Sequence, residues 1–320
     1  MRRREHLNPG QRPLTGGVRM KLGMIGLGRM GANMAQRLLR GGHAVVGFDP
    51  RAEARAALQE QGAETADSLA ALLAKLAPPR VLWLMVPAGE ITDTTLEALL
   101  PLLQVGDTLV DGGNSRYLDS QRRAATFVEH GIEYVDCGTS GGVWGLAEGY
   151  SLMIGGAEAA VERLRPLFEC LAPAPGRGWG RVGPVGAGHF AKMIHNGIEY
   201  GLMQAYAEGF SILHHKQEFD LDLQQLAEIW SHGSVVHSWL LELTAKALAE
   251  HPDMHDIAPY VADSGEGRWT VDEAIALGVP APVITHALIA RLRSRDAESF
   301  ADRLLAALRN QFGGHEVRKG

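Results

Sequence analysis

The stretch KLGMIGLGRMG, residues 21–31, decides the fold of the first half of the chain. KLGMI, residues 21–25, is a short, mostly apolar run of the kind that forms a buried strand. The amphipathic stretch MGANMAQRLLRGG, which begins at Met30, has the pattern of a helix. Between them, GLGRMG has the G-x-G-x-x-G spacing of a dinucleotide-binding turn. Gly26 permits the tight turn, Gly28 lets a pyrophosphate approach the backbone, and Gly31 allows the helix to pack closely on the strand. The helix N-terminus at this turn then supplies amide donors for the phosphates.

Short apolar runs alternate with helical patterns from Lys21 to about Gly183. The further predicted strands are HAVVGFD, RVLWLMV, DTLVDGG, IEYVDCG and YSLMIGG. The further predicted helices are RAEARAALQEQG, DSLAALLAKL, ITDTTLEALLPLL and EAAVERLRPLFECL. Such alternation is typical of a mostly parallel sheet with helices on both faces.

The character of the sequence changes after LAPAPGRGWGRVGPVGAGH, a segment dense in glycine and proline that we predict to be a hinge. Beyond it the pattern is helical. The predicted fold class is therefore an α/β Rossmann-like N-terminal domain over residues 20–184, followed by an all-α substrate and dimerisation domain over residues 185–320. Residues 1–19 are basic without a following apolar segment, which predicts a disordered extension. Met20, directly before the first strand, is a candidate alternative start of the natural protein.

The composition narrows the classes of partner. The chain has 320 residues, a formal charge of −6 and no basic stripe interleaved with aromatic residues, so nucleic acid is not expected as a partner. No run is long enough to cross a bilayer. Cys137 and Cys170 lie in apolar surroundings without metal-ligand spacing, which predicts buried thiols in a reducing, cytoplasmic setting. We expect neither a membrane partner nor a bound metal.

Asp49 ends the second predicted strand, about 20 residues after the glycine turn, as the dinucleotide fingerprint requires. A carboxylate there accepts hydrogen bonds from a free ribose 2′-hydroxyl and repels a 2′-phosphate. Arg51, two residues later, partly offsets that repulsion. The sequence therefore favours NAD and leaves NADP possible.

The stretch GAGHFAKMIHNGIEYGLMQ, residues 186–204, predicts a helix with an unusual polar stripe. Lys192 and Glu199 are seven residues apart, which is roughly 10 Å along a helix axis. A small extended substrate fits between such a cation and carboxyl; the alternative is a solvated polar face. One angular sector of the predicted helix holds Lys192, His195, Asn196, Glu199, Tyr200 and Met203.

Five motifs together resemble the decarboxylating 6-phosphogluconate dehydrogenase family. They are GLGRMG, MVPAG, DGGNS at 111–115, TSGG at 139–142 and GAGHFAKMIHNGIEYG. The resemblance runs from about Met20 to the C-terminus, and the length is similar to the shorter bacterial form. It implies oxidative decarboxylation of 6-phosphogluconate to ribulose 5-phosphate and CO₂, in the pentose phosphate pathway, with Lys192 as general base and Glu199 as general acid.

The resemblance also implies the remaining site residues. Predicted substrate contacts are Asn114, Ser140, Gly141, Gly142, His195, Asn196, Tyr200, Arg291, Arg309 and His315. Predicted cofactor contacts are Gly26, Leu27, Gly28, Arg29, Met30, Gly31, Asp49, Arg51, Val86, Pro87, Ala88 and Asn114. Within this set the SGG loop holds the sugar-acid carboxylate and Arg291 the phosphate. Arg309 and His315 occupy tail positions that reach into a neighbouring subunit's site, which implies a homo-oligomer, dimer or tetramer.

One stretch departs from the family pattern. Where the long form has a lysine and a threonine beside the phosphate, in a KGTGKW-like stretch, this chain has SGEGRW with Ser264 and Glu266. A carboxylate is unfavourable beside a phosphate dianion unless Arg268 or Arg291 offsets it. The sequence therefore leaves open whether the substrate must be phosphorylated.

The expected chemistry needs both groups of the proposed pair. Lys192 takes a hydroxyl proton only when it is uncharged, so burial or nearby cations must lower its pKa well below about 10.4. The resulting β-keto acid loses CO₂, and Glu199 protonates the remaining enediol. The nearest alternative is a β-hydroxyacid dehydrogenase that oxidises a smaller or unphosphorylated acid without decarboxylation, which needs no second acid. A non-catalytic nucleotide sensor is a third alternative and predicts loss of the pair, which is present.

Overall fold

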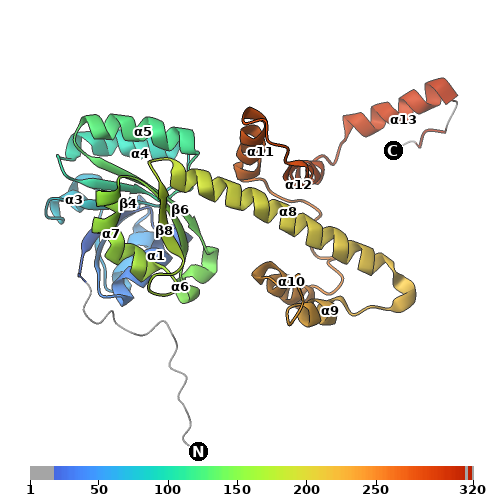
Figure 1. Cartoon of the computed structure of the whole chain (residues 1–320), viewed down its shortest axis with the longest axis horizontal. Helices are drawn as coiled ribbons and strands as arrows, with labels where there is room; N and C mark the ends of the chain where they lie inside the picture. Colours follow the sequence, from blue (N-terminus) through green and yellow to red (C-terminus); the bar gives the residue numbers. More distant parts are fainter. Residues whose placement is uncertain (1–17, 314–315, 319–320) are drawn as a thin grey trace, which may run out of the picture. The chain divides into compact units, whose positions relative to one another are not determined.

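The computed structural model describes residues 18–313 and 316–318 (Figure 1). The predicted N-terminal extension and the alternative start bear mainly on residues 1–17, which lie outside these ranges. The chain divides after His195 into two compact units. We call them the sheet unit, up to His195, and the helical unit, from Asn196, and describe each by itself. Within the described residues no helix has the length and apolar character needed to span a membrane.

The sheet unit contains one eight-stranded sheet with the order β3-β2-β1-β4-β5-β6-β7-β8. Neighbouring strands are parallel except for β6 and β7, which are antiparallel. The predicted α/β fold with a mostly parallel sheet is confirmed. The strands are β1 Lys21–Ile25, β2 Ala44–Phe48, β3 Glu64–Ala66, β4 Val81–Leu84, β5 Thr108–Asp111, β6 Glu133–Ser140, β7 Ser151–Gly155 and β8 Trp179–Gly183.

Helices cover both faces of this sheet, because its central strands are apolar on both sides. One core cluster packs Met34 and Leu38 of α1 with Phe168 of α7, and the other packs Leu99 of α4 with Phe127 of α5. The helices of this unit are α1 Arg29–Arg40, α2 Ala52–Glu60, α3 Leu69–Ala74, α4 Glu90–Leu99, α5 Tyr117–Glu129, α6 Gly145–Glu148 and α7 Glu158–Leu171.

Strand order reverses between β1 and β4, since the chain first builds outward through β2 and β3 and then returns to the other side of β1. In open α/β sheets, ligands bind beyond the carboxyl ends of the strands at such a switch point. The loops that follow β1, β4 and β5 therefore lie where a cofactor is expected.

Four of these strands and helices of the sheet unit were not predicted: β3, β8, α5 and the short α6. The interpretation of LAPAPGRGWGRVGPVGAGH as a plain hinge was wrong, because the segment contains β8, which pairs with β7 from Leu152 to Gly155. Its glycines are tolerated because β8 is an edge strand, hydrogen-bonded on one side only.

The helical unit is built around most of α8, a helix of 29 residues. Its small cores are a cluster with Phe210, Leu241 and Leu248, and a second with Tyr200 and Leu288. The all-helical character of this part is confirmed. The helices are α8 Ala187–His215, α9 Leu223–Trp230, α10 Trp239–Glu250, α11 Glu266–Ala276, α12 Pro282–Arg293 and α13 Phe300–Gly313.

Candidate active site

The glycine turn after β1 has the shape that a dinucleotide needs. Gly26 adopts φ +91°, and a Cβ on Gly31 would lie 2.0 Å from the Gly26 carbonyl oxygen, so neither position accepts a side chain without rearrangement. Gly28, the N-cap of α1, has open space where a Cβ would stand and no side chain capping it. The first amides of α1, from Arg29 and Met30, are thus available to an anion. These residues fit the pyrophosphate of a nicotinamide dinucleotide.

Asp49 lies buried just beyond the end of β2, beside this turn. Its carboxylate accepts the Leu27 backbone N–H at 2.8 Å and the Arg51 backbone N–H at 3.0 Å, while the Arg51 guanidinium bonds both oxygens at 3.0 and 3.2 Å. Burial by itself raises the pKa of Asp49, but the hydrogen bonds from Arg51 and Leu27 outweigh it and hold the pKa below 3.8. The carboxylate is therefore charged, and Arg51 is its exposed counter-ion.

Two further loops end at the same edge of the sheet. The loop after β4 carries Val86, half-buried, with Pro87 and Ala88 exposed. The loop after β5 carries Asn114, held at φ +53°. The Asn114 amide donates to the Thr139 carbonyl oxygen at 3.1 Å and accepts the Thr139 N–H at 2.9 Å. This pair of bonds joins the β5 loop to β6, one residue before Ser140.

Lys192, His195 and Ser140 form a short chain of polar contacts. Lys192 is only 5% exposed, and its Nζ lies 3.4 Å from His195 Nδ1. His195 Nε2 lies 3.5 Å from Ser140 Oγ, at the end of β6. Gly141 and Gly142 follow with φ of +131° and +51°. The structure thus brings the predicted base, one predicted positioning residue and the start of the predicted carboxylate loop together.

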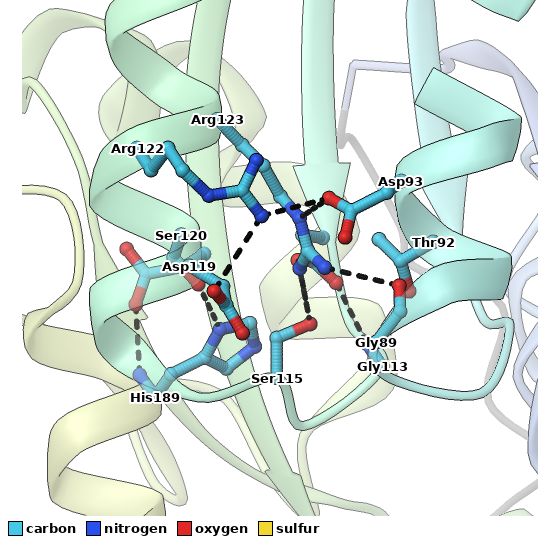
Figure 2. A network of polar contacts seen from close by, with 12 residues as sticks. Gly89, Thr92, Asp93, Gly113, Ser115, Asp119, Ser120, Arg122, Arg123 and His189 are labelled. Carbon is cyan, nitrogen blue, oxygen red and sulfur yellow. Dashed lines mark hydrogen bonds and ion pairs between the residues drawn. The ribbon is translucent and has the colours of Figure 1, made fainter. Parts of the chain in front are cut away.

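The start of α8 is fixed by β6. Asp136 Oδ1 accepts the Gly186 N–H and Asp136 Oδ2 the His189 N–H, both at 2.7 Å, which caps donors that the helix leaves unpaired. His189 Nδ1 also lies 2.7 Å from Ser120 Oγ of α5 (Figure 2). A Cβ on Gly138 would lie 2.4 Å from the Lys192 Cβ, so the helix can approach β6 only where the strand has glycine. These contacts place Lys192 beside β6.

In the helical unit, Tyr200 is the centre of a second polar group. Its hydroxyl lies 3.3 Å from both Asp263 Oδ1 and Ser264 Oγ, and the Arg291 guanidinium carbon lies 3.5 Å from the centre of its ring. Ser264 Oγ in turn donates to Glu266 Oε2 at 2.8 Å. The structure therefore brings together Tyr200, Arg291 and the two residues at which the chain departs from the family pattern.

The arginines near Glu266 are engaged elsewhere. Arg268 forms an ion pair with Asp263, and Arg291 donates to the Ala262 carbonyl oxygen at 3.3 Å. Burial raises the pKa of Asp263, but the hydrogen bonds from Arg268 and the Gly265 backbone reverse this and hold it below 3.8. Arg268 therefore serves first as counter-ion to Asp263.

The other predicted residues are placed as follows. Asn196 and Glu199 are half-buried on α8, and Arg309 is exposed on α13. His315 lies outside the described residues. No group of three or more histidine, cysteine or acidic side chains with metal-binding geometry occurs among residues 18–313 and 316–318. Asp136 was missed because its partners, Gly186 just before α8 and His189 in its first turn, are 50 and 53 positions away. An aspartate inside an apolar strand is nevertheless a signal in the sequence.

A Rossmann-type sheet, a phosphate-binding glycine turn and a buried acid at the end of β2 define the class: a nicotinamide-dependent oxidoreductase. Residues 21–180 match the family described as the NAD binding domain of 6-phosphogluconate dehydrogenase, and residues 188–311 match the C-terminal domain of 6-phosphogluconate dehydrogenase. The chain belongs to the 6-phosphogluconate dehydrogenase family.

Individual relatives agree with this assignment. The chain is 48% identical, over 94% of its length and 99% of the relative's, to the NAD(+)-dependent, decarboxylating 6-phosphogluconate dehydrogenase of Haloferax volcanii. It is 36% identical to the decarboxylating enzyme of Lactococcus lactis subsp. cremoris, over 91% of this chain and 65% of that one. The Plasmodium falciparum 6-phosphogluconate dehydrogenase structure matches with a TM-score of 0.79 and 29% identity, over 94% of this chain and 66% of that one. The predicted short form is confirmed.

Proposed function

We propose that this chain oxidises 6-phosphogluconate with NAD and releases CO₂ and ribulose 5-phosphate. The observation that carries the proposal is the 48% identity to an NAD(+)-dependent, decarboxylating relative across 99% of that protein. The stretch GAGHFAKMIHNGIEYG, residues 186–201, overlaps the start of the match to the C-terminal domain of 6-phosphogluconate dehydrogenase at residues 188–311. We place the protein in the cytoplasm, since both cysteines are free and buried and suit a reducing compartment.

The cofactor site uses the edge of the sheet at the strand switch point. The amides at the start of α1 bind the pyrophosphate, and Asp49 binds the ribose hydroxyls. To do so, Asp49 exchanges its bonds to the Arg51 guanidinium for bonds to the hydroxyls, while the Leu27 N–H keeps the carboxylate oriented. NAD, when bound, accepts the hydride from C3 of the substrate. The negative charge on Asp49 disfavours a 2′-phosphate, which is the basis of the proposed preference for NAD.

Lys192 acts as the general base. The residue is 5% exposed, and burial favours the uncharged form of an amine. The neutral amine takes the proton of the C3 hydroxyl as hydride leaves, and the ammonium so formed donates a hydrogen bond to the C3 carbonyl. That bond draws electron density from the C1 carboxylate and promotes loss of CO₂. His195, 3.4 Å from the amine, orients it and contacts the substrate.

Glu199 acts as the general acid two turns further along α8. It protonates the enediol carbon that was C2 of 6-phosphogluconate and becomes C1 of ribulose 5-phosphate, after CO₂ has left and from the side opposite the base. Asn196 binds a substrate hydroxyl between the two groups. Ser140, Gly141 and Gly142 hold the carboxylate, since backbone N–H groups at positive φ converge on one point and the serine adds a hydroxyl donor.

The proposed phosphate contact is an arginine of the helical unit. Arg291, fixed by stacking on Tyr200, binds the phosphate bidentately. Arg309 and His315 come from a second copy, so the working enzyme is a homo-oligomer. The support is an apolar stripe on α13, where Phe300, Leu304 and Leu308 are all largely exposed in the single chain.

An initial-rate assay with purified protein tests the proposal. It compares 6-phosphogluconate with gluconate, each with NAD and with NADP, and we expect the highest kcat/KM for 6-phosphogluconate with NAD. Absence of activity on 6-phosphogluconate with either cofactor contradicts the proposal.

A second candidate is oxidation of an unphosphorylated sugar acid. Glu266, hydrogen-bonded through Ser264, brings a carboxylate next to Tyr200 and Arg291 and disfavours a dianion there. Activity confined to gluconate selects this candidate. A Glu266→Thr variant separates the two further: it improves KM for 6-phosphogluconate if the phosphate meets this carboxylate, and leaves KM unchanged if it does not.

A further inference from the structure

Arg123 is a buried arginine on α5 that touches both loops next to the strand switch point (Figure 2). Its side chain is 2% exposed. Toward α4, Nε donates to Asp93 Oδ1 at 2.8 Å and Nη2 to the Gly89 carbonyl oxygen at 3.2 Å. Toward the β5 loop, Nη1 donates to Ser115 Oγ at 2.9 Å and to Asp111 Oδ2 at 3.3 Å. One guanidinium therefore joins the end of the β4 loop to the β5 loop.

Asp111 extends this link into the β5 loop itself. Its Oδ2 also accepts the Ser115 and Tyr134 hydroxyls, both at 2.9 Å, and its Oδ1 accepts the Gly113 N–H at 3.1 Å. Asn114 lies in the sequence between Gly113 and Ser115, both of which bond to Asp111, and its own side chain bonds to Thr139 of β6. The β5 loop also packs directly on the β4 loop, since a Cβ on Gly113 would lie 2.6 Å from the Val86 carbonyl oxygen. Arg123 adds a polar link from the β5 loop to Gly89, at the far end of the β4 loop.

An arginine suits this position for reasons of shape and charge. The planar guanidinium presents several donors in fixed directions, so it can satisfy a carbonyl, a hydroxyl and two carboxylates at once. Asp111 is 1% exposed, and a buried carboxylate is costly unless an opposite charge and hydrogen bonds accompany it. Although burial lowers the pKa of Arg123, the hydrogen bond to Asp93 and the charge of Asp111 more than offset it, so the net shift is upward.

We propose that Arg123 is a positioning residue that sets the distance between the two loops bearing Val86–Ala88 and Asn114. The inference rests on the proposed function, in which these loops contact the bound NAD. Arg123 touches neither cofactor nor substrate, and acts through the Gly89 carbonyl and through Ser115. Its loss lets the loops separate, so the cofactor is bound less tightly while the substrate-side residues keep their own contacts.

The test is a fluorescence titration with NADH together with separate KM values for NAD and 6-phosphogluconate. The main variant is Arg123→Met combined with Asp111→Asn, which removes both charges and leaves no uncompensated carboxylate in the core. Its reference is Asp111→Asn alone. We expect Kd for NADH and KM for NAD to rise on the order of tenfold relative to the reference, with KM for 6-phosphogluconate within twofold. Ser115→Ala, a milder change, shifts the same two constants in the same direction.

Arg122→Met is the matched control. Arg122 is the neighbouring arginine and also pairs with Asp93, at 3.0 Å, but it is 60% exposed, and its other bond, at 3.5 Å, is to Asp119 of its own helix (Figure 2). Its removal is expected to leave Kd for NADH unchanged. The inference is overturned if Kd for NADH is the same in the double variant, in Ser115→Ala and in the reference. It is also overturned if KM for NAD and KM for 6-phosphogluconate rise by the same factor. Failure of the unmodified chain to bind NADH contradicts the proposed function instead.

Discussion

The sheet unit and the helical unit bury their side chains very differently. The sheet unit encloses large aromatic residues completely, among them Trp83, Tyr150 and Phe168, and it buries charged groups such as Arg123 and Asp111 within hydrogen-bonded networks. The two described cores of the helical unit are small, and the ion pairs that Arg293 and Arg303 form are solvent-exposed. The sheet unit is thus stabilised by its own interior.

The helical unit leaves apolar residues of several helices in contact with solvent in the single chain. Ile212 of α8, Ile275 of α11, Val283 of α12 and Phe300 of α13 are each more than two thirds exposed. Apolar side chains that gather into an exposed patch are typical of subunit interfaces. The difference fits the proposed roles, in which the sheet unit is the cofactor platform and the helical unit is the part that packs against a second copy. The following predictions test that contrast.

The largest effect is expected for Lys192→Met. A methionine of similar length keeps the packing against Gly138 but cannot take a proton, so kcat should fall about 1,000-fold. NADH titration is the control, and its Kd should stay within about twofold because the platform is intact. A variant that keeps a tenth or more of the wild-type kcat contradicts the role of Lys192.

A smaller effect is expected for Glu199→Gln. Glutamine keeps the shape of the side chain but cannot donate the proton to the enediol carbon that becomes C1 of ribulose 5-phosphate, so turnover should fall about 100-fold. The reduction of NAD in the first turnover, followed by stopped-flow absorbance, should be slowed much less than CO₂ release. If hydride transfer and CO₂ release slow by the same factor, Glu199 does not act after decarboxylation.

Charged substitutions on α13 should affect assembly and leave the platform intact. Leu304→Asp with Leu308→Asp is expected to dissociate the oligomer, because each change buries a carboxylate in the proposed interface. Multi-angle light scattering measures the mass, and NADH binding should be unchanged. The control is Val105→Asp in the sheet unit, where the valine is 79% exposed. If the α13 variant and the control have the same mass in solution, α13 of the helical unit does not form the proposed interface.

The smallest effect concerns acid stability of the sheet unit. Burial of His43 lowers its pKa below 6.5, and its Nδ1 accepts the Met20 N–H at 3.3 Å. The unfolded chain therefore binds more protons than the folded one, and the stability contributed above pH 6.5 is lost as pH falls through the lowered pKa. His43→Gln should reduce the loss of urea stability between about pH 7.5 and 5.5. An unchanged slope rules out this role.

The central part of the fold could be predicted because its strands are apolar on both faces. VLWL of β4 and TLVD of β5 are buried at every residue, and the predicted helix over Glu158–Leu171 coincides with α7. The edge strands β3 and β8 were missed because ETA and WGRVG are short and partly exposed. Helix α5 was missed because several of its buried residues are polar.

The site could be predicted where its residues are contiguous in sequence. Local sequence patterns predict three of its parts: the glycine turn, the SGG loop and the polar stripe on α8. The contributions of Asp136 and Arg123 depend on contacts with residues 30 to 53 positions away along the chain, which no local spacing reveals. Arg123 in particular looks like one charge of a polar helix until the sheet brings the β4 and β5 loops to it.

The most direct test of the central claim is the ratio of labelled CO₂ to NADH formed from 6-phosphogluconate that carries ¹³C at C1. A chain that oxidises and decarboxylates through the proposed Lys192 and Glu199 pair should release one labelled CO₂ for each NADH, and Lys192→Met should abolish both products together. NADH formed without labelled CO₂, or no NADH at all, would contradict the account.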